Sequence, residues 1–373
     1  MKKILILTTL LLFALSSVAF GASARWLALG GEQRFLIDTS NYANYPGRML
    51  QFADAVWIIP NHPSAPDHVM SGLLVKKGDM AWALHYNMPG TLGFGALRSG
   101  LAGSGNSTLT DLSTQIRPFP DVFLAMKMGD MTVGGRVVLG LASSEPVKDK
   151  TASAMSVDVA AGVTMAAGPG DVDLGVRVSI AGFSDDSTPK KTESTGGFAV
   201  AVDGRLMMSQ SEGKTLVPVF SGAFGSDVTV KDREDEVSYV TGDVGVGMMS
   251  KSKSMLVAGV LLGFGSVTSK PTSGDVSTTT LTVTYLGGYE KPITTWLTGR
   301  GGARGTLSLV SGDNWPANGK SASFSYGFGF RTAYKKVLLD VLLDNAFLNR
   351  GPYIVTGSGD SWSSNVCLTY MFD

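Results

Sequence analysis

The sequence predicts an all-β protein, a transmembrane antiparallel up-and-down β-barrel of about sixteen strands. The prediction rests on three observations. The chain contains long segments in which apolar and polar residues alternate, its content of charged residues is low, and the connections between segments alternate between short and long. Charged residues make up only 17% of the 373 residues, against about 25% in soluble proteins. Basic and acidic residues balance at 31 each, so no basic field points to nucleic acid.

The clearest alternation lies in residues 155–183. From Val172 to Ile180 every second residue is aliphatic, whereas Asp173 and Arg177 fall on the opposite face. This is the pattern of a strand with one apolar side. Residues 157–165 repeat it, and Gly-Pro-Gly-Asp between the two halves supplies tight-turn chemistry. The segment is therefore a hairpin whose apolar face needs an apolar partner.

Similar segments continue along the chain and end in short turns that carry Lys or Asp, or in longer Gly-rich loops. Many span more than the roughly 9–11 residues that cross a bilayer, and the alternation of connections matches short periplasmic turns and longer extracellular loops. A sheet in lipid must close, because open edges leave backbone groups unpaired. We expect strands at 52–59, 69–76, 80–88, 119–127, 131–142, 157–165, 172–180, 196–208, 215–230, 237–249, 255–268, 276–289, 293–310, 322–332, 337–348 and 361–372.

The chain divides into three regions. Residues 1–24 contain Lys2-Lys3, an apolar run and Ala22-Ser23-Ala24, the order of a cleavable signal peptide. Residues 25–50, called the leader below, do not alternate and are expected in the periplasm or the lumen. Residues 51–373 form the barrel; fourteen strands is the alternative if 52–59 belongs to the leader. Export by the signal peptide places the barrel in the cell outer membrane.

The leader contains Gly30-Gly31, then Asp38, then Tyr45-Pro46-Gly47. It resembles the N-terminal segment of FadL-type outer-membrane transporters, where Asn-Pro-Ala stands in place of Tyr-Pro-Gly. The resemblance implies that the leader enters the barrel as a hatch. The alternative is an ordered leader without a transport role. Candidate plug residues are Arg34, Asp38, Asn41 and Asn44.

The end of the chain also carries a pattern. Val366, Leu368, Tyr370 and Phe372 alternate with smaller or polar residues, and Asp373 follows. This resembles the C-terminal signal that the barrel-assembly machinery recognises. It implies that machinery and periplasmic chaperones as partners, besides the lipid bilayer and lipopolysaccharide. Aromatic residues near strand ends fit interfacial girdles: Trp57, Trp82, Tyr86, Tyr239, Tyr285, Tyr289, Trp296, Tyr326, Tyr334 and Trp362.

If the apolar faces meet lipid, charged residues of both signs point inward. In a barrel of sixteen strands, wide enough for an aqueous channel, they would line a pore and set ion preference. The alternative is that they pair with one another in a narrow or plugged lumen. Candidate pore-lining residues are Arg136, Asp158, Asp171, Asp173, Arg177, Asp203, Arg205, Asp243, Arg331, Asp340 and Asp344. The longest loop, 89–118, either folds inward or remains outside.

No constellation predicts an enzyme. The histidines number three, Gly-x-Ser-x-Gly is absent, and the Gly-rich pieces lie in strands rather than before helices. The single Cys367 excludes internal disulfides. We therefore expect no catalytic residues, no metal and no cofactor. The predicted function is a porin-like channel for passive diffusion of small solutes or ions; the alternatives are a FadL-like transporter of hydrophobic molecules and a non-conducting scaffold. A homo-oligomer is left open.

Overall fold

The computed structural model describes much of the chain: residues 25, 28–29, 32–36, 39–52, 54–59, 70–86, 97, 101, 108–111, 117–147, 150–186, 192–194, 196–227, 231, 236–270, 275–312, 319–344 and 364–372. The predicted signal peptide lies outside these residues. Among them, no helix has the length and apolar content needed to span a bilayer.

The strands follow one another along the chain as β1 (Ala55–Ile59), β2 (Met70–Lys77), β3 (Met80–Tyr86), β4 (Arg117–Met128), β5 (Met131–Val147), β6 (Lys150–Ala167), β7 (Gly170–Asp185), β8 (Thr192–Glu193), β9 (Gly197–Ser211), β10 (Lys214–Ser226), β11 (Glu236–Lys251), β12 (Met255–Lys270), β13 (Val276–Pro292), β14 (Leu297–Gly312), β15 (Gly319–Tyr334), β16 (Val337–Asp344) and β17 (Ser364–Met371).

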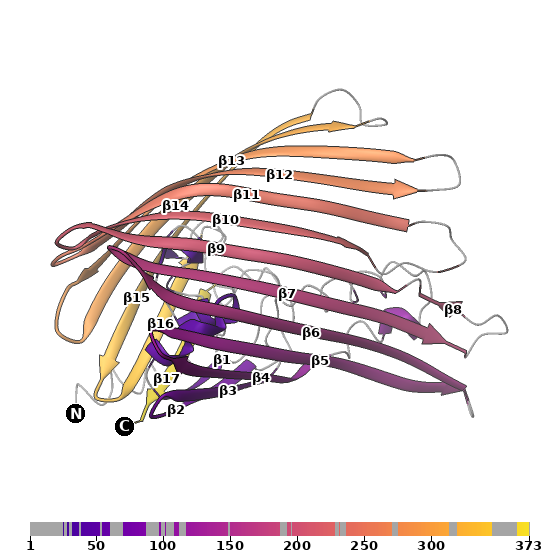
Figure 1. The fold of residues 1–373 in the computed structure, drawn as a ribbon, viewed down its shortest axis with the longest axis horizontal. Coiled ribbons are helices and arrows are strands. Elements are labelled where there is room, and N and C mark those ends of the chain that lie inside the picture. Colours follow the sequence, from indigo (N-terminus) through magenta and orange to yellow (C-terminus); the bar gives the residue numbers. More distant parts are fainter. Residues whose placement is uncertain are drawn as a thin grey trace, which may run out of the picture.

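These strands form one closed antiparallel sheet (Figure 1). Each long strand pairs with its neighbours in the chain, and β17 pairs with β1, for example Ala55 with Met371. The two-residue β8 pairs only with the end of β7, which itself pairs with β9. The ring therefore contains sixteen strands, and the predicted antiparallel up-and-down barrel is confirmed.

The short turns lie where the sequence predicts them, with one exception. The sequence predicts a turn at Glu290-Lys-Pro292, but β13 continues through Pro292, which pairs with Thr298. The turn lies at 293–296, where Ile293 N–H donates to the Leu297 carbonyl at 2.8 Å. Proline lacks an N–H, yet the end of a strand tolerates it. At the other end of the barrel, β5, β6 and β7 extend beyond their predicted ends to residues 147, 150 and 185, and β10 ends earlier, at residue 226.

The outer surface carries an apolar band. On β5, Val137 and Leu141 face outward and are exposed, whereas Arg136 and Val138 face inward and are buried. The band on β5 runs from residue 131 to residue 141, about 33 Å along a strand. At the tilt of about 40° usual in such barrels this becomes about 25 Å, the height of the apolar band of an outer-membrane barrel.

The leader lies inside the ring. It contains three 3-10 helices, η1 (Gln33–Phe35), η2 (Thr39–Ala43) and η3 (Pro46–Gln51), drawn in indigo within the curve of the sheet (Figure 1). Tyr45 precedes η3 and Pro46 occupies its first turn, where the absent N–H costs nothing. Residues of η3 contact the inner faces of β3 to β7.

Candidate functional site: the leader and the barrel lumen

Glycines on the inner wall allow the leader backbone to approach closely. A Cβ on Gly134 of β5 would lie 2.5 Å from the Pro46 carbonyl oxygen, and one on Gly162 of β6 would lie 2.8 Å from Pro46 Cδ. Gly175 of β7 faces the Asn44 carbonyl in the same way. Real Cβ atoms do not approach other atoms this closely, so alanine at these positions would push against backbone. Three neighbouring strands therefore form a glycine seat beneath residues 44–47.

The seat continues around the wall. Phe35 lies against Gly247 of β11 and Gly259 of β12, and a Cβ on Gly247 would lie 2.5 Å from Phe35 Cγ. A Cβ on Gly288 of β13 would lie 2.5 Å from the Leu29 carbonyl oxygen. Leu29 and Phe35 belong to one apolar cluster with Val217, Val257 and other wall residues. As the residue number rises, the leader passes from β13 through β12 and β11 toward β7, β6 and β5.

The leader and the wall bury each other. In the leader, Phe35, Tyr45 and Met49 are fully buried, as are Asn41 and Arg48. Inward-facing side chains are buried on most strands of the ring: Leu74, Ala83, Phe123, Arg136, Thr164, Asp173, Arg205, Val217, Val257, Leu286, Arg300, Leu342 and Cys367. The lumen is therefore packed where the leader crosses it.

Asp173 links the leader to two strands. Its carboxylate accepts hydrogen bonds from Arg48 Nε at 2.7 Å, from Arg205 Nε at 2.7 Å and from Thr164 Oγ1 at 2.6 Å. All four side chains are buried. Arg48 also reaches Asp171 on the same strand at 2.9 Å. A buried carboxylate held between two arginines is costly to disrupt, because the loss of one partner leaves the others uncompensated.

Arg205 holds a turn of the leader through backbone oxygens. Its Nη1 donates to the carbonyls of Leu36 at 2.6 Å and Arg34 at 3.0 Å, and to Asn41 Oδ1 at 3.2 Å. Its guanidinium also lies over the Tyr45 ring, 4.7 Å from the centroid. Arg205 thus holds residues 34–45 against the wall.

Arg34 connects η1 to β11. It pairs with Glu32 at 2.8 Å and with Asp243 at 2.5 Å, and Ser221 also donates to Asp243. Burial alone would lower the pKa of Arg34, but the hydrogen bonds and charges of Glu32 and Asp243 outweigh it and raise this pKa. The side chain therefore remains a cation.

A second chain of ion pairs starts at Arg25. Arg25 and Arg300 both bind Glu290, at 3.0 and 2.6 Å. Arg300 continues to Asp340 at 2.5 Å, and Asp340 also binds Arg331 at 2.8 Å. This series of ion pairs joins the start of the leader to β13, β14, β15 and β16.

An aromatic cluster fixes η2. The Tyr42 hydroxyl lies 2.6 Å from His85 Nε2, and its ring packs edge-on against Phe123. Asp121 binds Arg136 at 2.9 Å and lies beside His85. Trp57, expected in an outer girdle, instead faces inward against His85 and Gly72. The lack of a side chain on Gly72 leaves space for its ring.

Burial affects the two leader tyrosines. It is the main cause that raises the pKa of the Tyr42 hydroxyl, and the charge of Asp121 adds to it. Burial likewise raises the pKa of Tyr45, although the charge of Arg205 partly opposes it. Both phenols therefore remain protonated well into the alkaline range.

Most of the predicted inward-facing charges meet a partner. Besides the residues above, Arg177 binds Asp203 at 2.7 Å, and Ser179 donates to Asp158. Among those whose side chains the structure describes, only Asp171, Arg331 and Asp243 keep exposed side-chain fractions above a quarter, at 43%, 33% and 27%. The side chain of Asp344, and Asp38 in the leader, lie outside the described residues. Pore lining remains a prediction for these residues.

Of the four predicted plug residues, three have described contacts with the wall. Arg34 and Asn41 make the contacts given above, and Asn44 contributes its backbone carbonyl.

At the end of the chain Leu368 and Tyr370 face outward while Cys367 faces inward, and the Val366 side chain is not among the described ones.

Sequence reasoning does not identify several residues of this site. Asp121 and Arg300 lie on inward positions of alternating strands, so alternation was a usable signal for them. The sequence predicts that Glu290 lies in a turn. Arg48 carried no signal, because a non-alternating segment does not indicate which side chain faces the wall.

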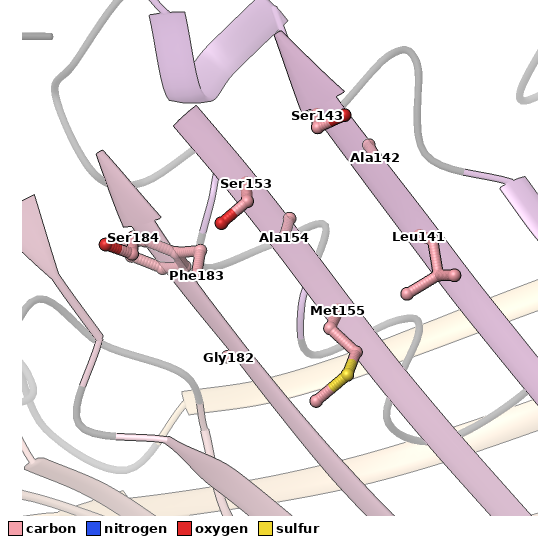
Figure 2. Close-up of a pocket in the computed structure, with 9 residues that line it drawn as sticks. All are labelled: Leu141, Ala142, Ser143, Ser153, Ala154, Met155, Gly182, Phe183 and Ser184. Carbon is pink, nitrogen blue, oxygen red and sulfur yellow. The ribbon is translucent and has the colours of Figure 1, made fainter. Parts of the chain in front are cut away.

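The outer ends of β5 to β7 carry apolar groups on both faces. A cavity of about 580 Å³ lies among these three strands, and Figure 2 shows the residues that line it. Leu141, Met155 and Gly182 belong to the outward face there. On the inward face, Leu97, Leu101 and Leu109 pack with Phe183, Ala154 and other small residues. The described part of the 89–118 loop therefore packs against the wall.

A second cavity, of about 280 Å³, lies between η1 and β11 to β14. Its lining is polar, and glycines on β12 provide its open space. It includes Glu32, Arg34, Thr241, Asp243, Gly263, Thr280, Thr282, Thr284 and Arg304. The two cations and two anions balance, and the hydroxyls can donate as well as accept.

Together, the closed ring of sixteen strands and the apolar outer band define a bacterial outer-membrane β-barrel. No protein-family model and no curated protein sequence matches the chain. Solved transport barrels show a similar architecture. The toluene transporter TodX of Pseudomonas putida matches with a TM-score of 0.40 at 10% identity, over 87% of this chain and 92% of that chain.

Two larger proteins match in part. The FrpB iron transporter of Neisseria meningitidis gives a TM-score of 0.43 at 8% identity, over 83% of this chain and 63% of that chain. CdiB of Escherichia coli gives a TM-score of 0.46 at 10% identity, over 86% of this chain and 62% of that chain. The chain thus spans less than two thirds of these two proteins. At such identities the likeness is one of barrel architecture alone.

Proposed function

We propose that this protein is an outer-membrane transporter for small hydrophobic molecules, in which the leader is a plug that rearranges during passage. The observation that carries the proposal is the mutual burial of the leader and the surrounding wall. A permanently open porin needs a hydrated lining along its whole length. Here, where the leader crosses the lumen, the wall side chains are covered and most of the charges are paired.

The hydrophobic class of solute is supported by the outer ends of β5 to β7. Apolar side chains lie on both faces of the wall there, with the 580 Å³ cavity beside Leu141 and Met155 and the Leu97 cluster behind it. Ligand sites for apolar molecules are lined mainly by apolar groups with a few polar ones. Ser143, Ser153 and Ser184 are the polar groups at this cavity.

The second candidate is diffusion of polar solutes. The 280 Å³ cavity favours it, because threonine hydroxyls and balanced charges line it beside Arg34. In that case the solute would pass along β11 to β14, and the leader would move away from the wall on that side.

Uptake of radiolabelled toluene by Gram-negative cells that express the protein tests the main proposal. We expect uptake above that of cells with an empty vector, and a several-fold loss in Met155→Ser. Met248→Ser is the matched control, because Met248 faces outward on β11 with 44% exposure, close to the 48% of Met155, but lies away from the cavity.

The polar candidate needs a different readout. Vesicles that contain the purified protein should not swell in glucose if the plug admits only hydrophobic molecules. Rapid swelling, with toluene uptake no higher than in empty-vector cells, would replace the main proposal by the second candidate. If neither solute crosses, the remaining function is a non-conducting scaffold.

A further inference from the structure

The end of the barrel with short connections is strongly basic. We call it the basic rim: residues 76–79, 127–130, 168–171, 211–214, 250–254, 290–296 and 334–337. It contains nine lysines and five acidic residues. Asp171 and Glu290 are neutralised by leader and wall arginines. The lysines therefore face three other acids of the rim, together with Asp54, whose carboxylate accepts from Lys76 N–H at the same end.

Neighbouring turns of the rim touch one another. Lys251 N–H donates to the Gly213 carbonyl at 2.6 Å, and Ala333 N–H donates to Trp296 at 2.8 Å. Lys127 N–H donates to the Asp79 carbonyl at 2.8 Å. These backbone bonds join separate hairpin turns, so their lysines form a continuous surface.

The rim lysines point into solvent. Lys77, Lys214, Lys251, Lys253 and Lys291 are exposed. Within the part of the chain that the structure describes, they make no ion pair. Their charges are therefore available to an external partner.

Aromatic side chains lie next to these lysines on the outer face. Tyr289 and Trp296 are about half exposed beside Lys291, and the Tyr289 hydroxyl donates to Ser254 at 3.0 Å in the Lys253 turn. Tyr334 carries the Lys335 ammonium over its ring at 5.6 Å. Aromatic side chains of this kind sit at the level of lipid headgroups. The lysines thus lie at headgroup height.

The opposite end of the barrel has the reverse balance. The connection 227–236 alone contains five acidic residues against two basic ones. The positive charge therefore belongs to one rim and is not a property of the whole surface, since the chain has a formal net charge of zero.

We propose that the basic rim binds the headgroups of anionic phospholipids in the periplasmic leaflet. Short connections of outer-membrane barrels face the periplasm, and lysines near an anionic surface each favour binding by roughly fivefold. The aromatic neighbours favour a lipid over a soluble partner, because they place the charges in the plane of the headgroups. This interaction is independent of the solute that the barrel passes.

Quenching of tryptophan fluorescence by brominated lipids tests the proposal. The full chain is reconstituted in phosphatidylcholine with added phosphatidylglycerol, and either lipid is brominated. We expect stronger quenching by brominated phosphatidylglycerol, because Trp296 lies in the rim. High salt should reduce the preference, since it screens exposed charges. Equal quenching by the two lipids, or a preference insensitive to salt, would overturn the proposal.

Variants localise the effect. Lys251→Gln, Lys253→Gln and Lys291→Gln together should reduce the phosphatidylglycerol preference at least tenfold. The matched control removes three lysines at the opposite end, by Lys231→Gln, Lys270→Gln and Lys320→Gln, and should leave it unchanged.

Heat-modifiable migration in electrophoresis confirms that both triple variants remain folded barrels. Loss of preference in the control variant alone would contradict the proposal. Absent lipid preference, combined with salt-sensitive cosedimentation of the solubilised protein with peptidoglycan, would assign the rim to the cell wall instead.

Discussion

Replacement of Asp173 by asparagine removes the charge that joins the leader to the wall while keeping the size of the side chain. The carboxylate pairs with Arg48 of the leader and Arg205 of β9, and all three groups are buried. Breaking a buried pair costs about 3–5 kcal/mol, because the remaining charge is left uncompensated. At about 1.4 kcal/mol for each factor of ten, release of the leader should become roughly two to three and a half orders of magnitude more favourable.

The assay combines conductance in planar bilayers with limited proteolysis at the leader arginines. Asp173→Asn should show openings that are rare in the natural protein, and its leader should be cleaved faster. Thr164→Val removes only one hydrogen bond to the same carboxylate, about 1.5–3 kcal/mol for a charged acceptor, so its effect should be smaller.

Asp79→Asn serves as the matched control, because Asp79 lies exposed in the β2–β3 turn. It should behave as the natural protein does. The reasoning is refuted if Asp173→Asn keeps the leader protected and the conductance unchanged while the barrel remains folded.

Three further predictions concern the same interface. Gly134→Ala should loosen the leader and speed its proteolysis, because the new Cβ would press on Pro46 backbone; Gly135→Ala, whose Cβ would lie 3.6 Å from its nearest neighbour, should not. Phe35→Ala should weaken leader docking by about 3–5 kcal/mol, measured as leader protection in increasing denaturant, and an unchanged midpoint would contradict the packing of Phe35 against the wall. Burial raises the pKa of the Tyr42 and Tyr45 hydroxyls, so the docked leader holds these protons more tightly than the released one. Docking should therefore be constant below about pH 10, the ordinary tyrosine pKa, and weaken above it; tyrosinate absorbance and conductance would follow this, and openings that increase on acidification instead would contradict it.

The barrel was predictable because its physics is repeated along the chain. Each strand must place apolar side chains toward lipid, so Val137 and Arg136 alternate in the way that reveals both the strand and its two faces. The closure of the ring followed from the need to pair every backbone group in lipid. The turn at 293–296 was displaced because Glu290 and Pro292, polar or turn-forming residues in isolation, extend a strand beyond the membrane.

The contacts of the leader were less accessible. Alternation correctly placed Asp173 and Arg205 on the inner face, but it does not reveal whether an inward charge meets water or another chain segment. Arg48 and Phe35 lie in irregular backbone without periodicity, so their partners emerge only from the tertiary arrangement. The glycines at 134, 162 and 175 were a usable signal in retrospect, since glycine inside a strand often marks close approach of another backbone.

The central claim is that the leader closes the lumen, and single-channel conductance of the purified protein tests it most directly. The intact chain should give no steady current steps in a planar bilayer, whereas a form that lacks residues 25–50 should give stable, salt-dependent steps. Equally large steady steps from the intact chain would show that the lumen is open with the leader in place, and would contradict the account.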